Sequence, residues 1–354
     1  LGYIKRTSLS EFRTQGRGGI GSRGSTTRDE DFLEHLFVAT NHNYLLIFTQ
    51  KGQCYWMRVF DIPEGTRQSK GRAIINLVQL AADDKVVAYL NVKDLKSEDY
   101  LNNHFVVLCT KKGIIKKTTL EAYSRPRANG IIAVGIREGD ELLEARLTNG
   151  NCHIIMASKD GKAIHFEESR VRPMGRGASG VIGMDLDDED GKNQVVGMLT
   201  IDAAEVATRQ VLVVSSKGYG KRSPVEDYRI INRGGKGVKT LQVTDKTGKL
   251  VAIKDVRDDD HLMIITRNGI TIRIGLDEMR VLGRATQGVR LIELRDKDKI
   301  AAVAKVDIEL HEDENATPTE GEAGTPSEGT EGSEGGEGGE EGPTGTDVAD
   351  GGDE

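Results

Sequence analysis

The stretch VLVVSSKGYGKRSP, residues 211–224, decides the fold. Four apolar residues lead into a polar turn that ends at Gly218, and a second run with two basic residues follows. An apolar run, a turn containing glycine and a return run predict a β-hairpin. The same pattern occurs in LLIFTQKG ending at Gly52, VVLCTKKG at Gly113, HIIMASKDG at Gly161 and LMIITRNG at Gly269.

A second glycine follows the hairpin glycine at a nearly fixed distance. It lies nineteen residues further on at Gly71, Gly180, Gly237 and Gly288, and seventeen further on at Gly130. Gly2 and Gly21 are also nineteen residues apart, which adds a sixth unit whose first half would precede residue 1. Self-similarity at a loose period near fifty residues predicts a repeat architecture. We therefore expect the chain to be a piece of a longer protein.

A third apolar run lies before each hairpin. These runs are residues 32–40, 86–92, 142–148, 195–201, 250–256 and, with no hairpin after it, 300–306. About four strands per repeat, arranged radially, predict an all-β propeller whose edges are protected by closure. Six such runs but five complete hairpins lead us to expect that residues 300–306 close the ring by pairing with the first unit.

The charge is divided between two segments. Residues 311–354 contain fifteen of the 56 acidic residues, no Lys or Arg and no aromatic residue. Such a segment cannot bury enough apolar surface to fold, so we predict a disordered acidic tail. The other 41 acidic residues face 49 Lys and Arg, which gives residues 1–310 a formal charge of +8, against −7 for the whole chain. The predicted propeller, residues 1–310, is thus a basic domain.

The sequence contains no recognisable catalytic motif. There is no P-loop, no nucleophile elbow and no HExxH, and the Gly-rich stretch GRGGIG lacks the strand and helix that a dinucleotide site needs. We expect no catalytic site, no metal and no cofactor in this domain. Cys54, Cys109 and Cys152 lie in apolar runs without metal-ligand spacing, which indicates reduced core thiols and a cytoplasmic protein. No run is apolar enough to span a membrane.

Basic residues recur at a fixed position within the repeats. They lie three or four residues after the hairpin glycine and again near the second glycine. In a radial repeat one phase corresponds to one face, so we predict a basic rim that binds duplex DNA through its backbone. Its members are Lys5, Arg6, Arg13, Arg23, Arg58, Lys70, Arg72, Lys116, Lys117, Arg125, Arg127, Arg176, Lys221, Arg222, Arg233, Lys236, Arg273, Arg284 and Arg290.

Four stretches together resemble one known family. They are YIKRTSLSEFRTQGRGGIG, HNYLLIFTQKGQCYWMRVFDIPEGTRQSKGRAIINL, GYGKRSPVEDY and VLGRATQGVRLIEL. In this order they resemble the C-terminal domain of gyrase A, over essentially all of residues 1–310. The resemblance implies a six-bladed β-pinwheel, a propeller-like ring that wraps duplex DNA around its rim. The wrap gives the positive crossover that lets DNA gyrase, an ATP-dependent type IIA topoisomerase, introduce negative supercoils.

The family signature Q-[RK]-R-G-G-[RK]-G, the gyrase A-box, falls on residues 15–21. Its positions are Gln15, Gly16, Arg17, Gly18, Gly19, Ile20 and Gly21. Gly16 and Ile20 replace two basic residues of the pattern, whereas residues 232–237, NRGGKG, match its latter part better. Either the box is split between two blades or the Gly-rich turn alone is what the site needs.

The resemblance also implies partners. They are duplex DNA, the catalytic core of gyrase A and gyrase B in an A2B2 holoenzyme that uses ATP and Mg²⁺, with the isolated domain a monomer in a bacterial, nucleoid-associated setting. Two alternatives stay open: the C-terminal domain of the A-type polypeptide of topoisomerase IV, which shares the fold, and a protein-interaction propeller.

Overall fold

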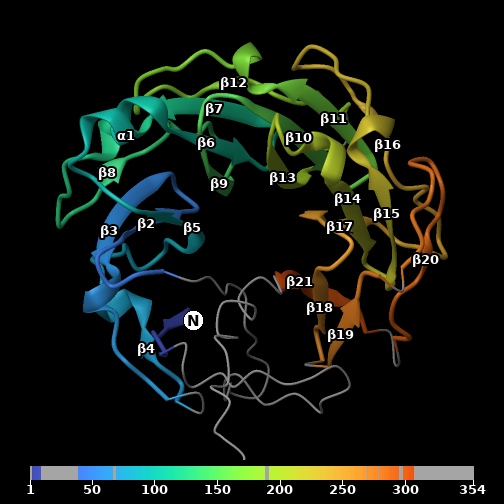
Figure 1. Ribbon diagram of the computed structural model, residues 1–354, viewed down its shortest axis with the longest axis horizontal. Coiled ribbons are helices and arrows are strands. Elements are labelled where there is room, and N and C mark those ends of the chain that lie inside the picture. The colour runs from blue at the N-terminus through green and yellow to red at the C-terminus, as the bar shows by residue number, and fades with distance from the viewer. Residues whose placement is uncertain are drawn as a thin grey trace, which may run out of the picture. The chain divides into compact units, whose positions relative to one another are not determined.

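The computed structural model is built almost entirely of β-strands (Figure 1). It describes residues 2–8, 39–66, 69–187, 191–268, 270–277, 279–294 and 298–306, all within one compact unit, Leu1–Glu312. The strands are β1 (Tyr3–Ile4), β2 (Tyr44–Thr49), β3 (Gln53–Arg58), β4 (Arg72–Ala73), β5 (Val86–Val92), β6 (Phe105–Thr110), β7 (Ile114–Thr119), β8 (Ile131–Ile132), β9 (Leu142–Thr148), β10 (Cys152–Ser158), β11 (Lys162–Glu167), β12 (Val181–Ile182), β13 (Val195–Asp202), β14 (Gln210–Ser215), β15 (Tyr219–Pro224), β16 (Val238–Lys239), β17 (Leu250–Val256), β18 (His261–Thr266), β19 (Thr271–Gly275), β20 (Val289–Arg290) and β21 (Ile300–Val306). The predicted all-β fold is confirmed.

Helical structure is limited to short segments. The described residues form one α-helix, α1 (Glu98–Asn103), capped by the Ser97 side chain. The 3₁₀ turns are η2 (Val59–Asp61), η3 (Ile74–Asn76), η4 (Leu120–Tyr123), η5 (Glu168–Arg170), η6 (Val206–Thr208) and η7 (Val225–Asp227). No helix of the described chain is long and apolar enough to cross a membrane.

Four of the described sheets are a hairpin flanked by two further strands. In the sheet β5-β2-β3-β8 the hairpin is β2–β3, β5 pairs with β2 at the inner edge, and β8 comes from the next unit. The sheets β9-β6-β7-β12, β13-β10-β11-β16 and β17-β14-β15-β20 repeat this order. Every one of these blades therefore borrows its short outer strand from the unit that follows.

The sheets follow one another as propeller-like blades. The inner strands of successive sheets are in contact, β5 with β9, β9 with β13, β13 with β17 and β17 with β21. Figure 1 shows β5, β9, β13 and β17 toward the middle, with β8, β12, β16 and β20 at the periphery. The outer strands and the loops that precede them therefore form the rim of this unit.

The described residues do not show the predicted ring closure. Residues 300–306 form β21, which pairs antiparallel with β18 in its own sheet, His261 facing Val306 and Ile264 facing Val303. The reason lies in the topology: among the described residues, each apolar run from residue 86 onward pairs with the hairpin before it. Six runs and five complete hairpins therefore need no circular pairing.

The described residues build five sheets of three or four strands rather than six. The sixth position is held by the two-stranded sheet β1–β4, in which Tyr3 faces Ala73 and Ile4 faces Arg72. Here β4 is the outer strand that the second unit lends to the incomplete first unit. The last sheet, β19-β18-β21, has three strands among the described residues.

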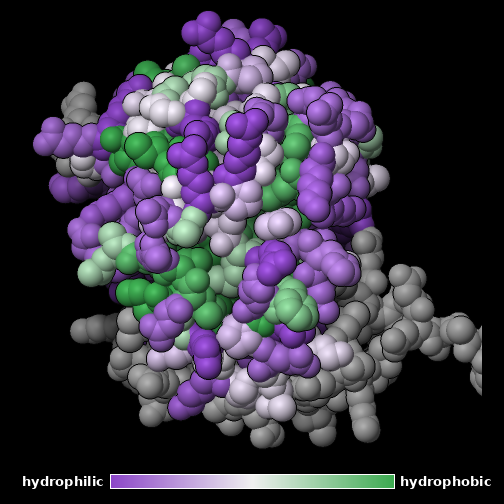
Figure 2. Space-filling model, turned by 90° about the vertical axis from the view of Figure 1, so that its left-hand side faces the viewer, coloured by the Kyte–Doolittle hydropathy of each residue, from purple (hydrophilic) through white to green (hydrophobic). Residues whose placement is uncertain are grey.

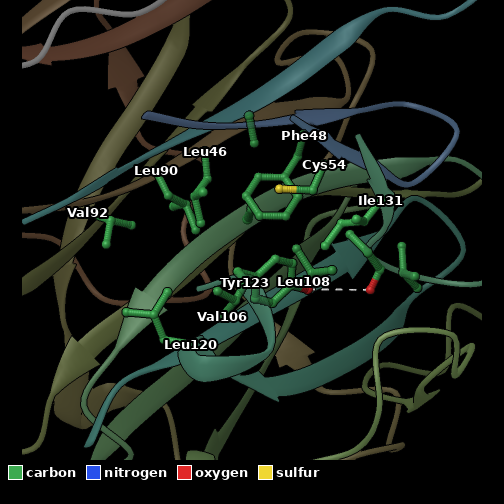
Figure 3. Packing of buried hydrophobic residues seen from close by; sticks show 14 of the residues in the cluster. Leu46, Phe48, Cys54, Leu90, Val92, Val106, Leu108, Leu120, Tyr123 and Ile131 are labelled. Carbon is green, nitrogen blue, oxygen red and sulfur yellow. Dashed lines mark hydrogen bonds between the residues drawn. The ribbon is translucent and has the colours of Figure 1, made fainter. Parts of the chain in front are cut away.

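The apolar core lies between neighbouring blades. Figure 3 shows the cluster between the first two complete blades, where Phe48 of β2 meets Tyr123 of η4 with ring centroids 5.9 Å apart. Leu46, Leu108 and Leu120 complete this contact and are almost fully buried. Cys54, Cys109 and Cys152 are buried and free, as predicted, and burial raises the pKa of the Cys109 thiol well above its usual value.

Candidate nucleic-acid interface

Five loops carry the outer strands. We define the rim loops as residues 63–71, 124–130, 172–180, 229–237 and 280–288, each ending at the second glycine of its unit. Gly237 shows why the sequence needs glycine there: its φ is +72°, and a Cβ would lie 2.3 Å from the carbonyl oxygen of Ala163 in β11. The glycine lets the loop cross the hairpin of the preceding blade at close range. The rim loops are thus held by blade-to-blade contact.

The structure buries part of the predicted basic rim. Lys116, Lys117, Lys221 and Arg222 lie in β7 and β15 and are at most 5% exposed. The Lys116 ammonium donates to the carbonyl oxygens of Ala133, at 2.6 Å, and Arg176. Lys221 donates to the carbonyl oxygens of Gly283, at 2.6 Å, and Arg284. The prediction that these four cations face outward is corrected, because all four are buried and Lys116 and Lys221 donate to the next rim loop.

Burial also changes the acidity of the two lysines. Burial, and secondarily the nearby guanidinium of Arg176, lowers the pKa of Lys116 to about 8. Burial and the guanidinium of Arg284 lower the pKa of Lys221 to about 8 in the same way. An ammonium that loses water pays a desolvation penalty, which the carbonyl oxygens offset only in part.

The next position in β7, β15 and β11 forms a second row of supporting contacts. Lys117 pairs with the buried carboxylate of Glu168 at 2.8 Å and lies 4.1 Å above the Phe105 ring. Arg222 donates from Nε to the Met279 carbonyl oxygen at 2.6 Å. His165 takes this place in β11, with Nδ1 2.6 Å from the Tyr228 carbonyl oxygen and a pKa lowered by burial. A basic side chain at this position therefore supports the fold.

The first unit shows the same bracing. Lys5 donates to the carbonyl oxygens of Thr66 and Ser69, each at 2.9 Å, in the rim loop 63–71. Arg6 donates from Nε to the Ile62 carbonyl oxygen at 2.9 Å and pairs with Glu64. Both side chains are half-buried.

The remaining described members of the predicted rim reach solvent. Those that are exposed are Arg58, Lys70, Arg72, Arg125, Arg127, Lys236, Arg273 and Arg290, and those that are half-buried are Arg176, Arg233 and Arg284. Some are neutralised: Arg58 pairs with Asp61, Lys236 with Asp187 and Arg290 with Glu293. Within the described residues, the Arg125 and Arg127 side chains form no hydrogen bond or ion pair, so their N–H donors are available.

Sequence reasoning missed three arginines of the rim loops. Arg172, Arg229 and Arg280 are exposed and, in the part of the chain that is described, their side chains make no polar contact. Each lies eleven residues after its hairpin glycine, as Arg13 does after Gly2. A search for basic residues eleven positions after each hairpin glycine would have found them.

The side of the molecule formed by the first sheets combines polar and apolar surface. Figure 2 shows hydrophilic side chains projecting between apolar patches. Ile132 of β8 and Phe60 of η2 are 54% and 63% exposed. The Arg6 guanidinium lies 5.7 Å from the centroid of the Phe60 ring, so a basic side chain adjoins this exposed apolar surface.

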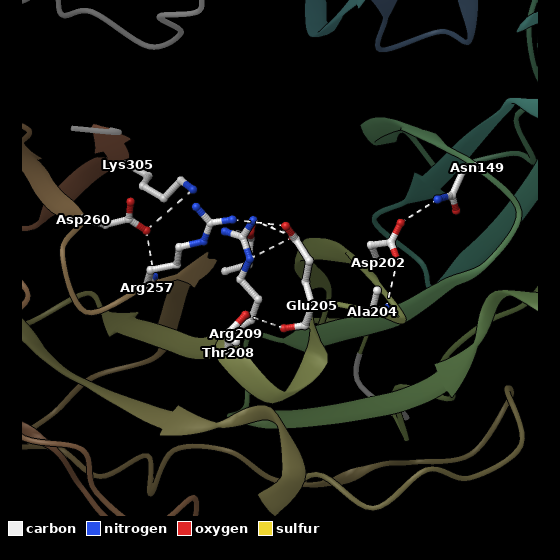
Figure 4. Close-up of polar contacts among 10 residues, drawn as sticks. Asn149, Asp202, Ala204, Glu205, Thr208, Arg209, Arg257, Asp260 and Lys305 are labelled. Carbon is white, nitrogen blue, oxygen red and sulfur yellow. Dashed lines mark hydrogen bonds and ion pairs between the residues drawn. The ribbon is translucent and has the colours of Figure 1, made fainter. Parts of the chain in front are cut away.

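Charged side chains on the inner loops are paired instead. Figure 4 shows Arg209 and Arg257 converging on Glu205, with N–O distances of 2.7 and 3.1 Å. Lys305 lies 3.6 Å from Asp260 in the same group. These cations are neutralised inside the unit, in contrast to Arg125, Arg127 and Arg172 of the rim loops.

Several predicted site residues lie outside the described residues. They are the gyrase A-box, residues 15–21, with Arg13 and Arg23, and the tail, residues 311–354. Among the described residues, no group of three His, Cys, Asp or Glu side chains is placed to hold a metal ion.

A family model matches all six repeats of the chain. A model described as DNA gyrase C-terminal domain, beta-propeller, matches residues 1–40, 43–93, 104–149, 153–201, 209–257 and 260–307. The chain belongs to this family. The six matched segments correspond to the six repeats counted from the glycine phase.

Individual relatives agree with this assignment. The chain is 43% identical over 327 residues to the gyrase A protein of Staphylococcus aureus strain NCTC 8325, and equally to that of strain COL. Each match covers 91% of this chain and 36% of the relative, so the chain spans about a third of its relatives' length.

Two solved structures share the fold. The C-terminal domain of DNA topoisomerase IV has a TM-score of 0.72 at 22% identity, covering 87% of this chain and 91% of that one. A DNA gyrase A C-terminal domain has a TM-score of 0.65 at 23% identity, covering 86% and 96%. At these identities the likeness establishes the fold alone.

Proposed function

We propose that residues 1–310 bind duplex DNA without sequence specificity and wrap it around the rim loops. The wrap would present the positive crossover from which DNA gyrase introduces negative supercoils. On this proposal the domain itself carries no catalytic site or cofactor and bends DNA that other parts of the enzyme cut.

One observation carries the proposal. Unpaired, exposed arginines recur on successive rim loops of the described chain, at Arg125 and Arg127, Arg172, Arg229 and Arg280. Guanidinium groups bind phosphate oxygens through several N–H donors at once. A duplex carries about one phosphate charge per 1.7 Å of its axis, so repeated cations suit it well.

The placement of the arginines favours a curved path. Bending 20–30 base pairs by 40–90° costs on the order of 1–6 kcal/mol, which contacts spread along an arc can offset. The outer strands offer the duplex no helix or long ribbon for the major groove, so we expect readout of backbone and shape.

The holoenzyme context is part of the proposal. We infer that the domain works in a cytoplasmic, nucleoid-associated A2B2 gyrase with the gyrase A core and gyrase B, where ATP and Mg²⁺ serve other domains. The S. aureus relatives are gyrase A proteins about two and a half times as long as this chain.

Closed circular DNA tests the proposal. A plasmid is relaxed by a type I topoisomerase with the full chain bound, the protein is removed and the topoisomers are separated. A positive wrap induces compensating negative supercoils in the unbound part of the plasmid, and the topoisomerase removes them. We therefore expect the linking number of the recovered plasmid to rise with protein concentration. Saturating binding without any shift in linking number would refute wrapping.

A further inference from the structure

A repeated backbone hydrogen bond joins each of three rim loops to the segment that follows the outer strand of the preceding unit. An N–H five residues after the second glycine of one unit donates to a carbonyl oxygen in the next rim loop. The pairs are Gly135 to Ala178 at 3.2 Å, Asp185 to Gly235 at 3.0 Å and Gln242 to Thr286 at 3.2 Å. Three successive blade junctions are therefore built alike.

Two of these junctions carry an additional arginine fork. Arg233 donates from Nε to the Arg170 carbonyl oxygen and from a terminal nitrogen to that of Ile182, both at 3.0 Å. Arg284 donates from Nε to the Asp227 carbonyl oxygen at 3.1 Å and from a terminal nitrogen to that of Lys239. Both forks are the same contact, because the acceptors occupy equivalent repeat positions.

Each fork ties one rim loop to two elements of the preceding unit in sequence. Arg170 and Asp227 end the 3₁₀ turns η5 and η7, while Ile182 and Lys239 end the outer strands β12 and β16. A planar guanidinium bound at two such points limits rotation as well as separation. The fork therefore fixes the angle between consecutive rim loops.

Arg176 supplies a natural control. It lies fifteen residues after its hairpin glycine, as Arg233 and Arg284 do, and it is similarly half-buried. Within the described residues its side chain forms no hydrogen bond, although its carbonyl oxygen accepts one from Lys116. The same charge at the same repeat position thus occurs with and without the fork.

We propose that Arg233 and Arg284 are positioning residues that set the angle between successive rim loops and hence the curvature of bound DNA. The inference rests on the proposed wrapping. DNA affinity depends on the number of cations near phosphates, whereas the curvature of the wrap depends on how rigidly the loops are held.

Replacement by lysine separates the two roles. Arg233→Lys/Arg284→Lys keeps both charges, but an ammonium lacks the planar fork that spans the two carbonyl oxygens. Binding to a duplex of about 10 base pairs, roughly one helical turn and too short to wrap, is measured across a salt series. The linking-number shift is measured on a plasmid at saturation. Arg176→Lys is the matched control, and the single Arg233→Lys and Arg284→Lys variants serve if the double variant does not fold.

We expect the double variant to bind the short duplex with wild-type affinity and salt slope but to lose most of the linking-number shift. Arg176→Lys should keep both. A full linking-number shift in the double variant overturns the inference, as does an equal loss of short-duplex affinity, which would make the arginines direct phosphate contacts. Absence of a shift in the wild type would refute the proposed function instead.

Discussion

The cations of the hairpin strands and those of the rim loops share one repeat but do different work. Lys117 and Lys221 lie beneath the surface, bound to a buried carboxylate and to backbone carbonyl oxygens. Arg125 and Arg172 project into solvent without such partners among the described residues. A recurring basic residue thus has two explanations, and its strand or loop position decides between them. We expect the first group to control stability and the second to control binding.

Removal of Lys117 should give the largest effect. Lys117→Met leaves the Glu168 carboxylate, 1% exposed, without its counter-charge, although Thr148 and the Cys152 N–H still donate to it. An uncompensated buried charge costs roughly 3–5 kcal/mol of unfolding free energy. Urea unfolding measures this, with the exposed Arg125→Ala as control. A loss no greater than that of the control would place Lys117 in the binding group.

The same site allows a rescue experiment. Glu168→Gln combined with Lys117→Met removes both charges, so the double variant should regain much of the lost stability. Additive losses would show that the ion pair is not what Lys117 contributes.

Gly237→Ala should give the next largest effect, by disturbing the support of a rim loop. The positive φ costs an L-residue about 1–2 kcal/mol, and a Cβ 2.3 Å from the Ala163 carbonyl oxygen forces the backbone to move. Forced backbone shifts typically cost about 1–3 kcal/mol more. Gly177→Ala in the preceding rim loop, where a Cβ meets nothing within 4 Å, is the control for thermal unfolding. Equal melting temperatures for the two variants would contradict this role of Gly237.

A smaller, pH-dependent effect should distinguish Lys221. Its pKa falls from 10.5 to about 8 in the folded state, so between these values the unfolded chain binds more protons. Stability contributed by Lys221 therefore rises with pH over this window. From about pH 8 to about pH 10, the unfolding free energy of the wild type should increase relative to that of Lys221→Met. The other titrating groups are present in both proteins, so their contributions cancel in this difference. A difference independent of pH would mean that the buried ammonium carries no desolvation cost.

The sequence predicts the repeat, the hairpins and the all-β class because glycine spacing reflects a local need for positive φ and close approach. It does not predict strand partners: the run 300–306 has the same pattern whether it pairs forward or backward, and only packing assigns it to β18. Charge phase likewise locates Lys116 and Arg125 without distinguishing buried from exposed, because both follow the same glycine. The Arg233 fork depends in part on the carbonyl oxygen of Arg170, 63 residues away, which no local pattern encodes.

Rim-loop substitutions should have the smallest effect on stability. Arg125→Gln, Arg127→Gln, Arg172→Gln and Arg229→Gln change exposed side chains without polar partners among the described residues, so each should alter the unfolding free energy by no more than about 0.5 kcal/mol. Thermal unfolding of the variant that combines all four is the check. A large drop in melting temperature would contradict the claim that the rim-loop cations, unlike those of the hairpin strands, do not stabilise the fold.

The salt dependence of duplex binding by that fourfold variant tests the central claim most directly. Each phosphate neutralised contributes about 0.9 to the slope of log affinity against log salt concentration. We predict that the slope falls by about 3.6 relative to wild type if each of the four arginines meets one phosphate. A wild-type slope in the variant would contradict the claim that the exposed rim loops bind DNA.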